Sequence, residues 1–324
     1  MPKRYLLCRP RGGLNDVFCQ IIRCIEYAKR EKRYLIIDIK REKFFSALSE
    51  FIVIKKGINF ISFCNNEEEI AKFEGLSVYP PHIHGCIGSY RSIHLDEIGY
   101  VDDKYLKKLT FDFSCSYSEN LLVHEGCGGG TSSIYFFTYF GLAKNIVREI
   151  HAIRTEFPEN YSSIHVRNTD YQTDYLNAFK AIRDQIKGKN ILLCTDSIQV
   201  ERYAKKEYPD VRWLSSATIL DEFNGPLHYS INRDDDRQSL LLKSTLVDLF
   251  LMAYSDKVYI FKVRKYGFSG FSTLANNLSG NKYILRSASG IDGRAFLAVN
   301  FDRFRLKLYF KKLKVCELNK YLFS

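Results

Sequence analysis

The chain has 324 residues, of which 46% are hydrophobic and 15% aromatic, with only seven prolines. The length exceeds the usual size of one domain and the composition excludes a disordered or fibrous protein, so we expect about two folded domains. Lysine and arginine exceed the acidic residues, giving a formal net charge of +11. Such an excess favours an anionic partner, which can be nucleic acid, nucleotide phosphates or an acidic membrane.

The sequence shows no pattern typical of export or of a membrane span. Its basic start, MPKRYLLCRPRGG, holds too short an apolar run for a signal peptide, and no stretch approaches about 18 uncharged apolar residues. The nine cysteines are odd in number and never spaced as CxxC, which favours buried thiols in a reducing cytosol over disulfides or zinc. We therefore expect a cytoplasmic protein.

Short apolar runs rich in β-formers alternate with longer helical patterns, which is typical of α/β layering. Strands are predicted at residues 4–9, 33–39, 120–125, 162–167, 190–196, 211–215 and 257–261. Helices are predicted at residues 14–32, 133–153, 174–187, 198–207 and 238–254, and another starts near residue 269. Several strands are continuously apolar, as in a parallel sheet covered on both faces. Residues 55–119 are rich in turns and yield no clear pattern.

We expect two Rossmann-like domains of mostly parallel sheet that face each other across a cleft. The predicted long helix ends before Pro158, and a new series of strands and helices begins at Ser162. This places an N-terminal domain at 1–155 and a second domain at 156–290, followed by a basic tail at 291–324.

The first candidate site is RGGLND, residues 11–16, which follows the opening strand. In α/β sheets, ligands bind beyond the carboxyl ends of strands, where loops lead into helix N-termini. Gly12 and Gly13 permit close approach of the backbone to a ligand, and Asn15 or Asp16 can cap the helix. A tight turn with a capped helix is an equally good interpretation of this stretch alone.

The second candidate is IHVRNTDYQTDY, residues 164–175, where a strand ends in charged side chains. His165 and Arg167 point to the same face of the strand, and the guanidinium fork of Arg167 suits bidentate capture of a phosphate. The alternative is a structural ion pair of Arg167 with Asp170 or Asp196.

Two later stretches end strands with polar groups at the same expected edge. In LLCTDS, residues 192–197, Asp196 fits a helix cap better than a catalytic role. Further along, an apolar helix carrying Asp248 leads to the strand KVYIF and then to SGFS, residues 269–272, at a helix start. The free N–H groups and positive dipole of that start can hold a pyrophosphate, although a plain serine cap is the simpler interpretation.

In this order, the four stretches resemble the fucosyltransferase-like glycosyltransferases of GT-B architecture, which include bacterial nodulation-type α-1,6-, bacterial α-1,2- and eukaryotic core and protein O-fucosyltransferases. RGGLND with YLIID is similar to their first motif, IHVRNTD to their HxRxxD motif, and CTDS to their TDD or TDS segment. LVDLFLMAYSDKVYIF with GFSGFSTLANNL is similar to their closing nucleotide-binding motif. Two departures are residues 55–119 and Asn168, which stands where a second basic residue is common.

The resemblance implies an inverting, metal-independent glycosyltransferase without a cofactor, acting in cell-surface polysaccharide or glycoconjugate synthesis. GDP-fucose is the expected donor, and a glycan or lipid-linked glycan is the expected acceptor. By the same resemblance, Arg167 binds the donor pyrophosphate and Asp248 contacts the nucleoside. The full set of expected donor-site residues is His165, Arg167, Asp196, Asp248, Ser269, Phe271, Ser272, Gly12, Gly13 and Asn15.

Inversion needs a base for the acceptor hydroxyl and stabilisation of the departing diphosphate. Arg167 and the helix start near Ser272 can supply the stabilisation, because fixed positive groups act strongly in a closed cleft. In some members of the family a carboxylate shortly after the HxR motif is the base, and Asp174 lies one residue from that position. Asp16, from the opposite domain, is the second candidate, for which a structural cap is the simpler interpretation.

Three other patterns have a chemical and a plain interpretation. NRDDDRQS, residues 232–239, contains the DxD of metal-dependent GT-A transferases, but aspartate is favoured before a helix in any case. His82, His84 and Cys86 would share one face of a strand, but a fourth zinc ligand is not evident and a surface loop is favoured. The Gly-Gly-Gly run at 128–130 precedes a helix start and is a further candidate for ligand contact.

The C-terminal segment, residues 301–324, can form a basic amphipathic helix. This pattern fits an interfacial helix at the inner face of an anionic membrane, where a lipid-linked acceptor is met, and equally well a helix docked on the domains. The rivals to the enzyme hypothesis are the same fold with another nucleotide sugar and a non-catalytic binding protein for membrane or RNA. No RNA-recognition motif supports nucleic acid as a partner.

Overall fold

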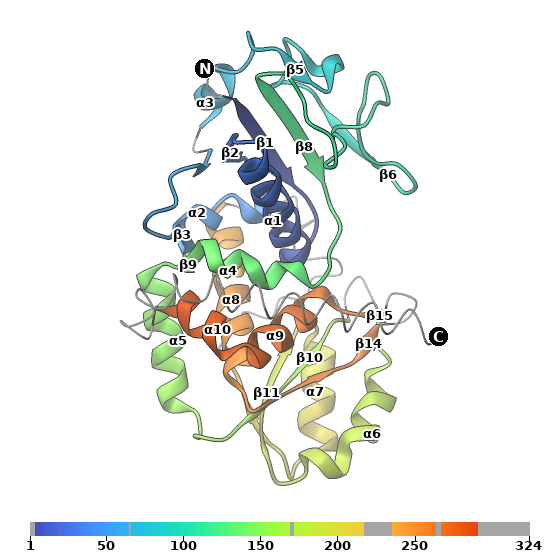
Figure 1. Ribbon diagram of the computed structural model, residues 1–324. Helices are drawn as coiled ribbons and strands as arrows, with labels where there is room; N and C mark the ends of the chain where they lie inside the picture. Colours follow the sequence, from blue (N-terminus) through green and yellow to red (C-terminus); the bar gives the residue numbers. More distant parts are fainter. Residues whose placement is uncertain (1–3, 65, 169–171, 217–234, 264–266, 291–324) are drawn as a thin grey trace, which may run out of the picture.

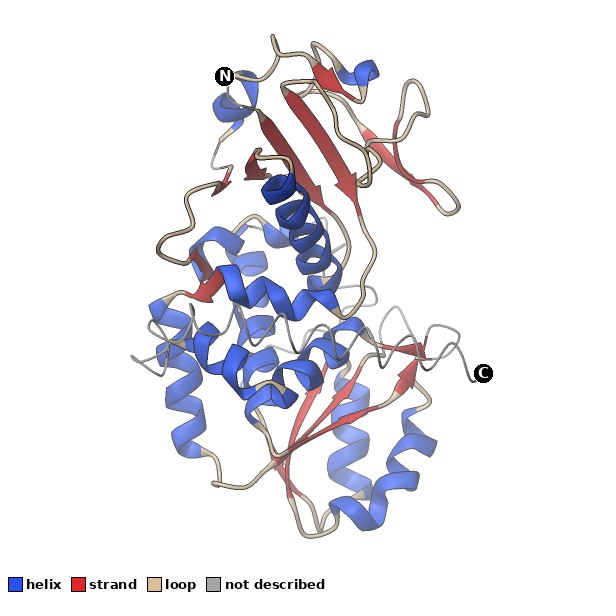
Figure 2. Ribbon diagram, in the orientation of Figure 1, coloured by secondary structure: helices blue, strands red, loops and turns tan. Residues whose placement is uncertain are grey.

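The computed structural model describes residues 4–64, 66–168, 172–216, 235–263 and 267–290. It has two lobes, each built on its own parallel sheet, with helices lying between the two sheets (Figures 1 and 2). The predicted α/β class with two mostly parallel sheets is confirmed. The division at residue 155 stays a prediction, and the tail at 291–324 lies outside the described residues.

The sheet of the first lobe has five parallel strands, in the order β4 (Ile61–Phe63), β2 (Tyr34–Ile37), β1 (Tyr5–Pro10), β8 (Leu121–Gly126) and β5 (Val78–Tyr79). The central strand β1 pairs with a neighbour on each side and is buried on both faces, which explains its continuous apolar run. Its register places Arg9 opposite Glu125, so polar groups gather where β1 and β8 end.

The sheet of the second lobe has four parallel strands, in the order β12 (Arg212–Leu214), β11 (Asn190–Thr195), β10 (Ser162–Val166) and β13 (Lys257–Ile260). All seven strands expected from the sequence are therefore present, within about two residues at each end. Polar residues follow the apolar runs of β10 and β11, so the carboxyl edge of this sheet carries the candidate groups.

The helices also follow the predicted order, apart from one. The α-helices are α1 (Leu14–Arg30), α2 (Leu48–Phe51), α3 (Glu67–Ala71), α4 (Phe136–Tyr139), α5 (Lys144–Glu156), α6 (Tyr175–Ile186), α7 (Ile198–Glu207), α8 (Asp235–Tyr254), α9 (Gly270–Gly280) and α10 (Lys282–Ser289). The described residues also form the short 3-10 helices η1 (Lys43–Phe45), η2 (Pro81–Ile83) and η3 (Ser132–Tyr135). None of the helices among the described residues has the length and apolar character to cross a bilayer.

The prediction of a single long helix at residues 133–153 is wrong. Its residues form η3 and α4, then the strand β9 (Phe140–Leu142), and then α5. The interruption arises because β9 pairs antiparallel with β3 (Ile52–Ile54), a partner nearly ninety residues earlier in the chain. The run IYFFTYFGL is apolar enough for either structure, and this tertiary pairing overrides the helical pattern.

Residues 55–119, which gave no pattern, complete the first lobe. They supply the outer strands β4 and β5 of its sheet, as well as a hairpin made of β6 (Ser92–Leu95) and β7 (Gly99–Asp102). The second lobe has a comparable short hairpin, β14 (Lys262–Val263) with β15 (Gly267–Phe268).

Two metal interpretations of the sequence find no support in the described residues. The segment holding His82, His84 and Cys86 is a 3-10 turn with its flanks, so the expected strand face does not exist. No group of three or more potential ligands occurs in the described part of the chain. In the DxD stretch, Asp234 lies outside the described residues, and α8 begins directly after it.

One apolar cluster extends through both lobes, in addition to a smaller cluster in each. A single cluster of buried side chains runs from β1 and α1 through α4 and α8 to α9 and α10. Helix α10, near the end of the described chain, packs against α4 and β9 of the first lobe. The cysteines fit the predicted reduced state, since the eight described thiols are free and five of them are buried.

Lys55 lies at this junction. Its ammonium group donates to the Phe137 carbonyl of α4 and, at 2.7 Å, to Ser287 Oγ of α10. Burial lowers the pKa of Lys55 to about 8. The side chain therefore connects α4 to α10, and burial makes its charged form less favourable than in water.

We predict a pH-dependent difference in stability between the wild type and Lys55→Met. Between pH 8 and pH 10.5, the ordinary lysine value, the unfolded chain holds more protons at this site than the folded chain. The free energy of unfolding of the wild type, relative to the variant, should therefore rise with pH across this window. Urea unfolding at several pH values measures it, with exposed Lys56→Met as control; a difference that does not change with pH contradicts the prediction.

Candidate active site

The starts of helices α1 and α9, one from each lobe, are in direct contact. A Cβ atom placed on Gly270 would lie 2.9 Å from Cβ and 3.1 Å from Nδ2 of Asn15, closer than real contacts allow. The absence of a side chain at residue 270 is therefore what lets the two helix starts meet. This contact brings the predicted RGGLND and SGFS stretches to one place.

Asn15 is buried and fully engaged at this contact. Its Nδ2 donates to the Gly130 carbonyl at 3.2 Å, and its Oδ1 accepts from Ser133 Oγ at 2.5 Å. A Cβ atom on Gly129 would lie 2.7 Å from Asn15 Nδ2. The glycine run at 128–130 therefore packs on the side chain of Asn15, and its contact with a ligand stays a prediction.

A buried relay of side chains fixes the same glycine run from behind. Gln20 of α1 donates from Nε2 to the Gly128 carbonyl at 2.6 Å, and its Oε1 lies 2.9 Å from Nε2 of His124. Nδ1 of His124 lies 2.7 Å from the hydroxyl of Thr110. Burial lowers the pKa of His124 to about 3, so the relay is neutral.

Asp16 serves as a cap but also faces the second lobe. Its Oδ2 accepts from the Gly13 amide at 3.0 Å, which closes the first turn of α1, and Gly12 has a φ of +98° that favours glycine. Burial raises the pKa of Asp16, while the Gly13 amide and the positive charge of Arg167 oppose that rise. Asp16 of the first lobe and Arg167 of the second are thus within electrostatic reach.

His165 and Ser272 join β10 to the start of α9. His165 Nδ1 lies 2.7 Å from Ser272 Oγ, and its ring centroid is 4.9 Å from that of Phe271. Desolvation, followed by repulsion from Arg167, lowers the pKa of His165 to about 3. The imidazole is therefore neutral, and the positive charge at this edge comes from Arg167.

The described residues on either side of 169–171 make several polar contacts. Thr173 Oγ1 donates to the Arg167 carbonyl at 2.6 Å, and the Asn168 amide donates to Asp196 Oδ1 at 2.7 Å. Asp174 is the N-cap of α6 and accepts from Asn177 Nδ2 at 2.8 Å. Asp196 therefore supports the backbone beside Arg167, and Asp174 has a helix-capping role that accounts for it without catalysis; Asp170 lies outside the described residues.

The start of α9 carries a buried hydroxyl without a partner. Ser269 is the N-cap of this 11-residue helix and is 7% exposed, yet its Oγ has no hydrogen-bond partner in the described structure. A buried polar atom left without a partner costs free energy, and an N-cap serine ordinarily uses its oxygen on the helix amides. The Ser269 hydroxyl and the free amides of α9 can therefore both serve an anion.

Asp248 lies at the end of β11. On α8 it is 7% exposed and adjoins Cys194, whose thiol pKa is raised by burial and then by Asp248. It also lines a hollow at the ends of β11 and β12, with Thr195, Trp213 and Ser215. The predicted donor residues thus divide between the helix start and this adjacent hollow.

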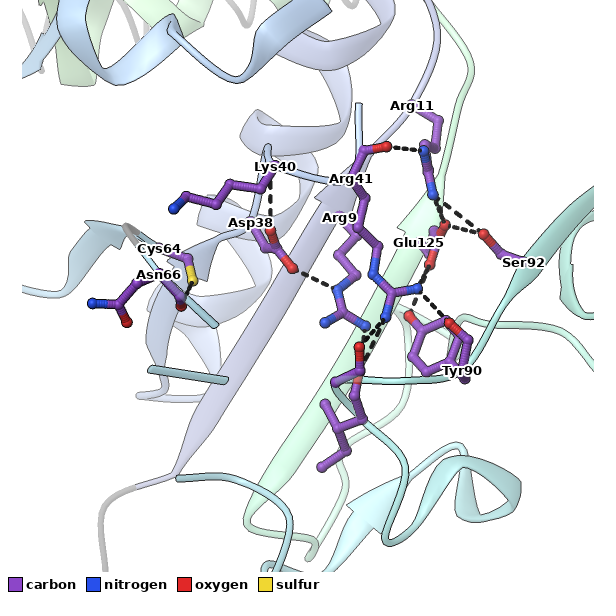
Figure 3. Close-up of polar contacts among 12 residues, drawn as sticks. Arg9, Arg11, Asp38, Lys40, Arg41, Cys64, Asn66, Tyr90, Ser92 and Glu125 are labelled. Carbon is purple, nitrogen blue, oxygen red and sulfur yellow. Dashed lines mark hydrogen bonds and ion pairs between the residues drawn. The ribbon is translucent and has the colours of Figure 1, made fainter. Parts of the chain in front are cut away.

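An ionic network at the ends of β1 and β8, shown in Figure 3, was not predicted from the sequence. Arg11 donates from Nη2 to Glu125 Oε1 at 2.6 Å, and Arg9 donates from Nε to Asp38 Oδ2 at 2.8 Å. Tyr90 donates to the other oxygen of Glu125 at 2.7 Å. Despite burial, Arg11 and its neighbours lower the pKa of Glu125.

This network holds the strand end that leads into Gly12 and Gly13. The only signal for it in the sequence is an arginine inside an apolar strand, LLCRP, which needs a carboxylate partner when buried. The partner of Arg11 is 114 residues away, so spacing along the chain does not reveal it.

Comparison with known proteins supports the fold. No protein-family profile and no curated protein matches the sequence. Among solved structures, fucosyltransferase NodZ from Bradyrhizobium aligns with a TM-score of 0.60 at 20% identity, over 85% of this chain and 93% of that chain. NodZ α-1,6-fucosyltransferase co-crystallised with GDP aligns at 0.58 and 19%, over 85% and 92%, and the crystal soaked with GDP-fucose at 0.57 and 19%, over the same shares.

The chain has the fold of these fucosyltransferases. The predicted GT-B-like architecture is therefore confirmed, and the likeness of fold covers 85% of the chain. The roles of the individual site residues stay predictions.

We predict that Gly270→Ala destabilises the protein by roughly 1–3 kcal/mol, because the added Cβ meets Asn15 in a packed contact. Gly280→Ala, in the same helix, has nothing within 4 Å of its new Cβ and should be neutral or stabilising by up to about 1 kcal/mol. Chemical denaturation of the two variants measures the difference. Equal stabilities would show that the helix starts are not in tight contact.

Proposed function

We propose that this chain is a glycosyltransferase that takes fucose from GDP-fucose and transfers it to a glycan with inversion. The observation that carries the proposal is the start of α9, where free amides and the unpartnered Ser269 hydroxyl lie beside the His165–Ser272 pair. The fold supports it, because the similar solved structures are named as fucosyltransferases, and two of them were exposed to GDP or GDP-fucose.

In this proposal the diphosphate of the donor lies between Arg167 and the start of α9. Helix amides and a guanidinium together form an anion site, and the neutral His165 fixes Ser272 without adding charge. The hollow lined by Asp248, Thr195 and Trp213 adjoins this edge through β11 and takes the nucleoside. In this arrangement the residues at the start of α9 bind the diphosphate, and the residues of the hollow bind the nucleoside of the same donor molecule.

We propose that no metal ion is needed. The leaving nucleotide gains negative charge as the sugar departs, and a fixed arginine and helix dipole aimed at that charge can stabilise it. Arg167 of the second lobe also interacts electrostatically with Asp16 of the first lobe. The positive charge of Arg167 therefore lies at the boundary between the lobes.

Asp16 is the base that we propose for the acceptor hydroxyl. It comes from the lobe opposite the donor edge, and its raised pKa makes its carboxylate a stronger proton acceptor than an exposed one. Asp174 is the weaker candidate because its oxygens hold the start of α6. The acceptor, a glycan or lipid-linked glycan, would then approach from the first lobe.

We place the enzyme in the cytoplasm, in the synthesis of a surface polysaccharide or glycoconjugate. The free thiols of the described cysteines support a reducing compartment.

Arg167→Ala should abolish donor binding and transfer while leaving the fold intact. In thermal unfolding with GDP, UDP, CMP and TDP, the wild type should respond selectively to GDP, with about 2.7 kcal/mol gained at a hundredfold excess over Kd. The variant should lose this response, and transfer should fall by about 100-fold or more. Exposed Arg148→Ala is the control, and transfer by the wild type should persist in EDTA. A GDP response retained in Arg167→Ala would refute the phosphate role.

Asp16→Asn should reduce kcat by about 10²- to 10⁴-fold with little change in GDP affinity, because an asparagine oxygen can still accept from the Gly13 amide. In the wild type, the rate should fall at acid pH as Asp16 takes up a proton, starting above the ordinary aspartate value of 3.8 because its pKa is raised. The variant should lack this limb of the pH profile. A larger loss in Asp174→Asn than in Asp16→Asn would assign the base to Asp174 instead.

A further inference from the structure

Exposed apolar side chains gather on one part of the first lobe, the hairpin β6–β7 and the loop after it. Of the eight large hydrophobic residues that are strongly exposed in the described chain, four lie here: Ile93, Ile98, Tyr105 and Leu106. The loop at residues 103–108, which we call the Lys-Tyr-Leu loop, holds the most exposed of them, Leu106 at 57%. Apolar side chains grouped in this way on a surface often mark a binding site.

The backbone of the Lys-Tyr-Leu loop is fixed by a buried carboxylate. Asp102 Oδ1 accepts from the amides of Lys104 at 3.1 Å and Tyr105 at 2.8 Å. The Asp102 amide donates to the Lys107 carbonyl, and the Leu106 amide donates to the Asp102 carbonyl, both at 2.9 Å. The loop is therefore a hydrogen-bonded turn with a defined backbone conformation.

Leu106 occupies a backbone conformation that does not suit leucine. Its φ is +54°, in the left-handed region where glycine and asparagine are favoured. A leucine at this position gains nothing from burial within the chain, since its side chain is exposed. Strain at an exposed apolar residue is better explained by a contact made outside the molecule than by the stability of the fold.

Three lysines surround these apolar side chains. Lys104, Lys107 and Lys108 are all exposed, and no ion pair among the described residues includes any of them. The ammonium group of Lys104 lies 4.8 Å from the Tyr105 ring centroid. The loop also holds one exposed carboxylate, Asp103, so it presents a tyrosine and a leucine within a segment of net positive charge.

We propose that the Lys-Tyr-Leu loop docks on an anionic lipid bilayer. Leu106 and Tyr105 enter the headgroup region, where tyrosine places its ring in the apolar part and its hydroxyl in water, and the three lysines contact lipid phosphates. A protein partner fits less well, because lysine is depleted from the centres of protein interfaces. The tip of the hairpin is a poorer contact, because exposed Asp96 and Glu97 flank Ile98 there.

Hydrogen bonds connect the Lys-Tyr-Leu loop and its hairpin to strand β8, which leads to the candidate site. Leu109, just after the loop, accepts from the Glu125 amide at 2.7 Å, and Ser92 at the start of the hairpin donates to the Glu125 carboxylate at 2.5 Å. Strand β8 then leads through Gly126 into the glycine run beside Asn15. If the proposed function holds, docking would place the acceptor side of the site near lipid-linked glycans.

Vesicle flotation of the full chain tests the docking. The wild type should bind phosphatidylcholine vesicles that contain phosphatidylglycerol and should not bind pure phosphatidylcholine. Leu106→Asn combined with Tyr105→Ser should weaken binding by about 10-fold or more, and glutamine at Lys104, Lys107 and Lys108 by about 10- to 100-fold. Leu106→Asn relieves the backbone strain, so lower stability does not account for the loss.

The controls are matched in chemistry. Ile98→Ser removes an exposed apolar side chain at the acidic tip, and glutamine at Lys180, Lys187 and Lys189 removes the same charge from the second lobe. Both should bind as the wild type does. Equal loss in the lysine control would show a general charge effect, and full binding by both loop variants would assign binding to another segment, such as residues 301–324; either result overturns the proposal.

Tryptophan fluorescence tests directly whether the loop enters the bilayer. In a Trp213→Phe background, L106W should shift its emission to the blue on anionic vesicles, and L176W, on the second lobe, should not. Absence of a shift at residue 106 overturns the proposal. Arg167→Ala should keep vesicle binding, so failure of the docking and failure of the proposed enzyme activity are separate results.

Discussion

The close contact between the starts of α1 and α9 is the constraint on which the rest of the structure depends. Two helices from different lobes meet there end to end, and only the missing side chain of Gly270 leaves room for Asn15. The amide-rich end of α9 is thereby held against the turn that carries Asp16, while β10 delivers Arg167 to the same boundary. The amide-rich helix start of one lobe and the Asp16 carboxylate of the other thereby face the same boundary.

Around that contact, buried ion pairs and hydrogen bonds fix the positions of the polar side chains. The pairs Arg11–Glu125 and Arg9–Asp38 fix the end of β1, and the neutral relay from His124 through Gln20 fixes the glycine run. Breaking a buried ion pair leaves an uncompensated charge, which commonly costs about 3–5 kcal/mol, so this wall of the site has little freedom to move. The positions of Asn15 and Asp16 are in this sense set by buried residues behind them.

Sequence reasoning succeeded where the physical signal is local. Strands such as β1 and β11 are continuous apolar runs, and capping residues stand at the starts of α1 and α6. Each of these elements can therefore be predicted from about ten consecutive residues. It failed where the partner is distant: β9 exists because β3 pairs with it, and Arg11 is neutralised by Glu125 from another strand. The SGFS stretch was predicted to begin a helix, and α9 does begin there, but the unpartnered hydroxyl of Ser269 is evident only from the packed structure.

The return of α10 onto α4 and β9 has a consequence for how this protein is made. A ribosome releases the first lobe well before residues 282–289, so its apolar surface stays uncovered while the whole second lobe is being synthesised. During that interval the nascent chain exposes the part of the core that Leu285 and Ala288 later cover, and it is then that chaperones have most to protect.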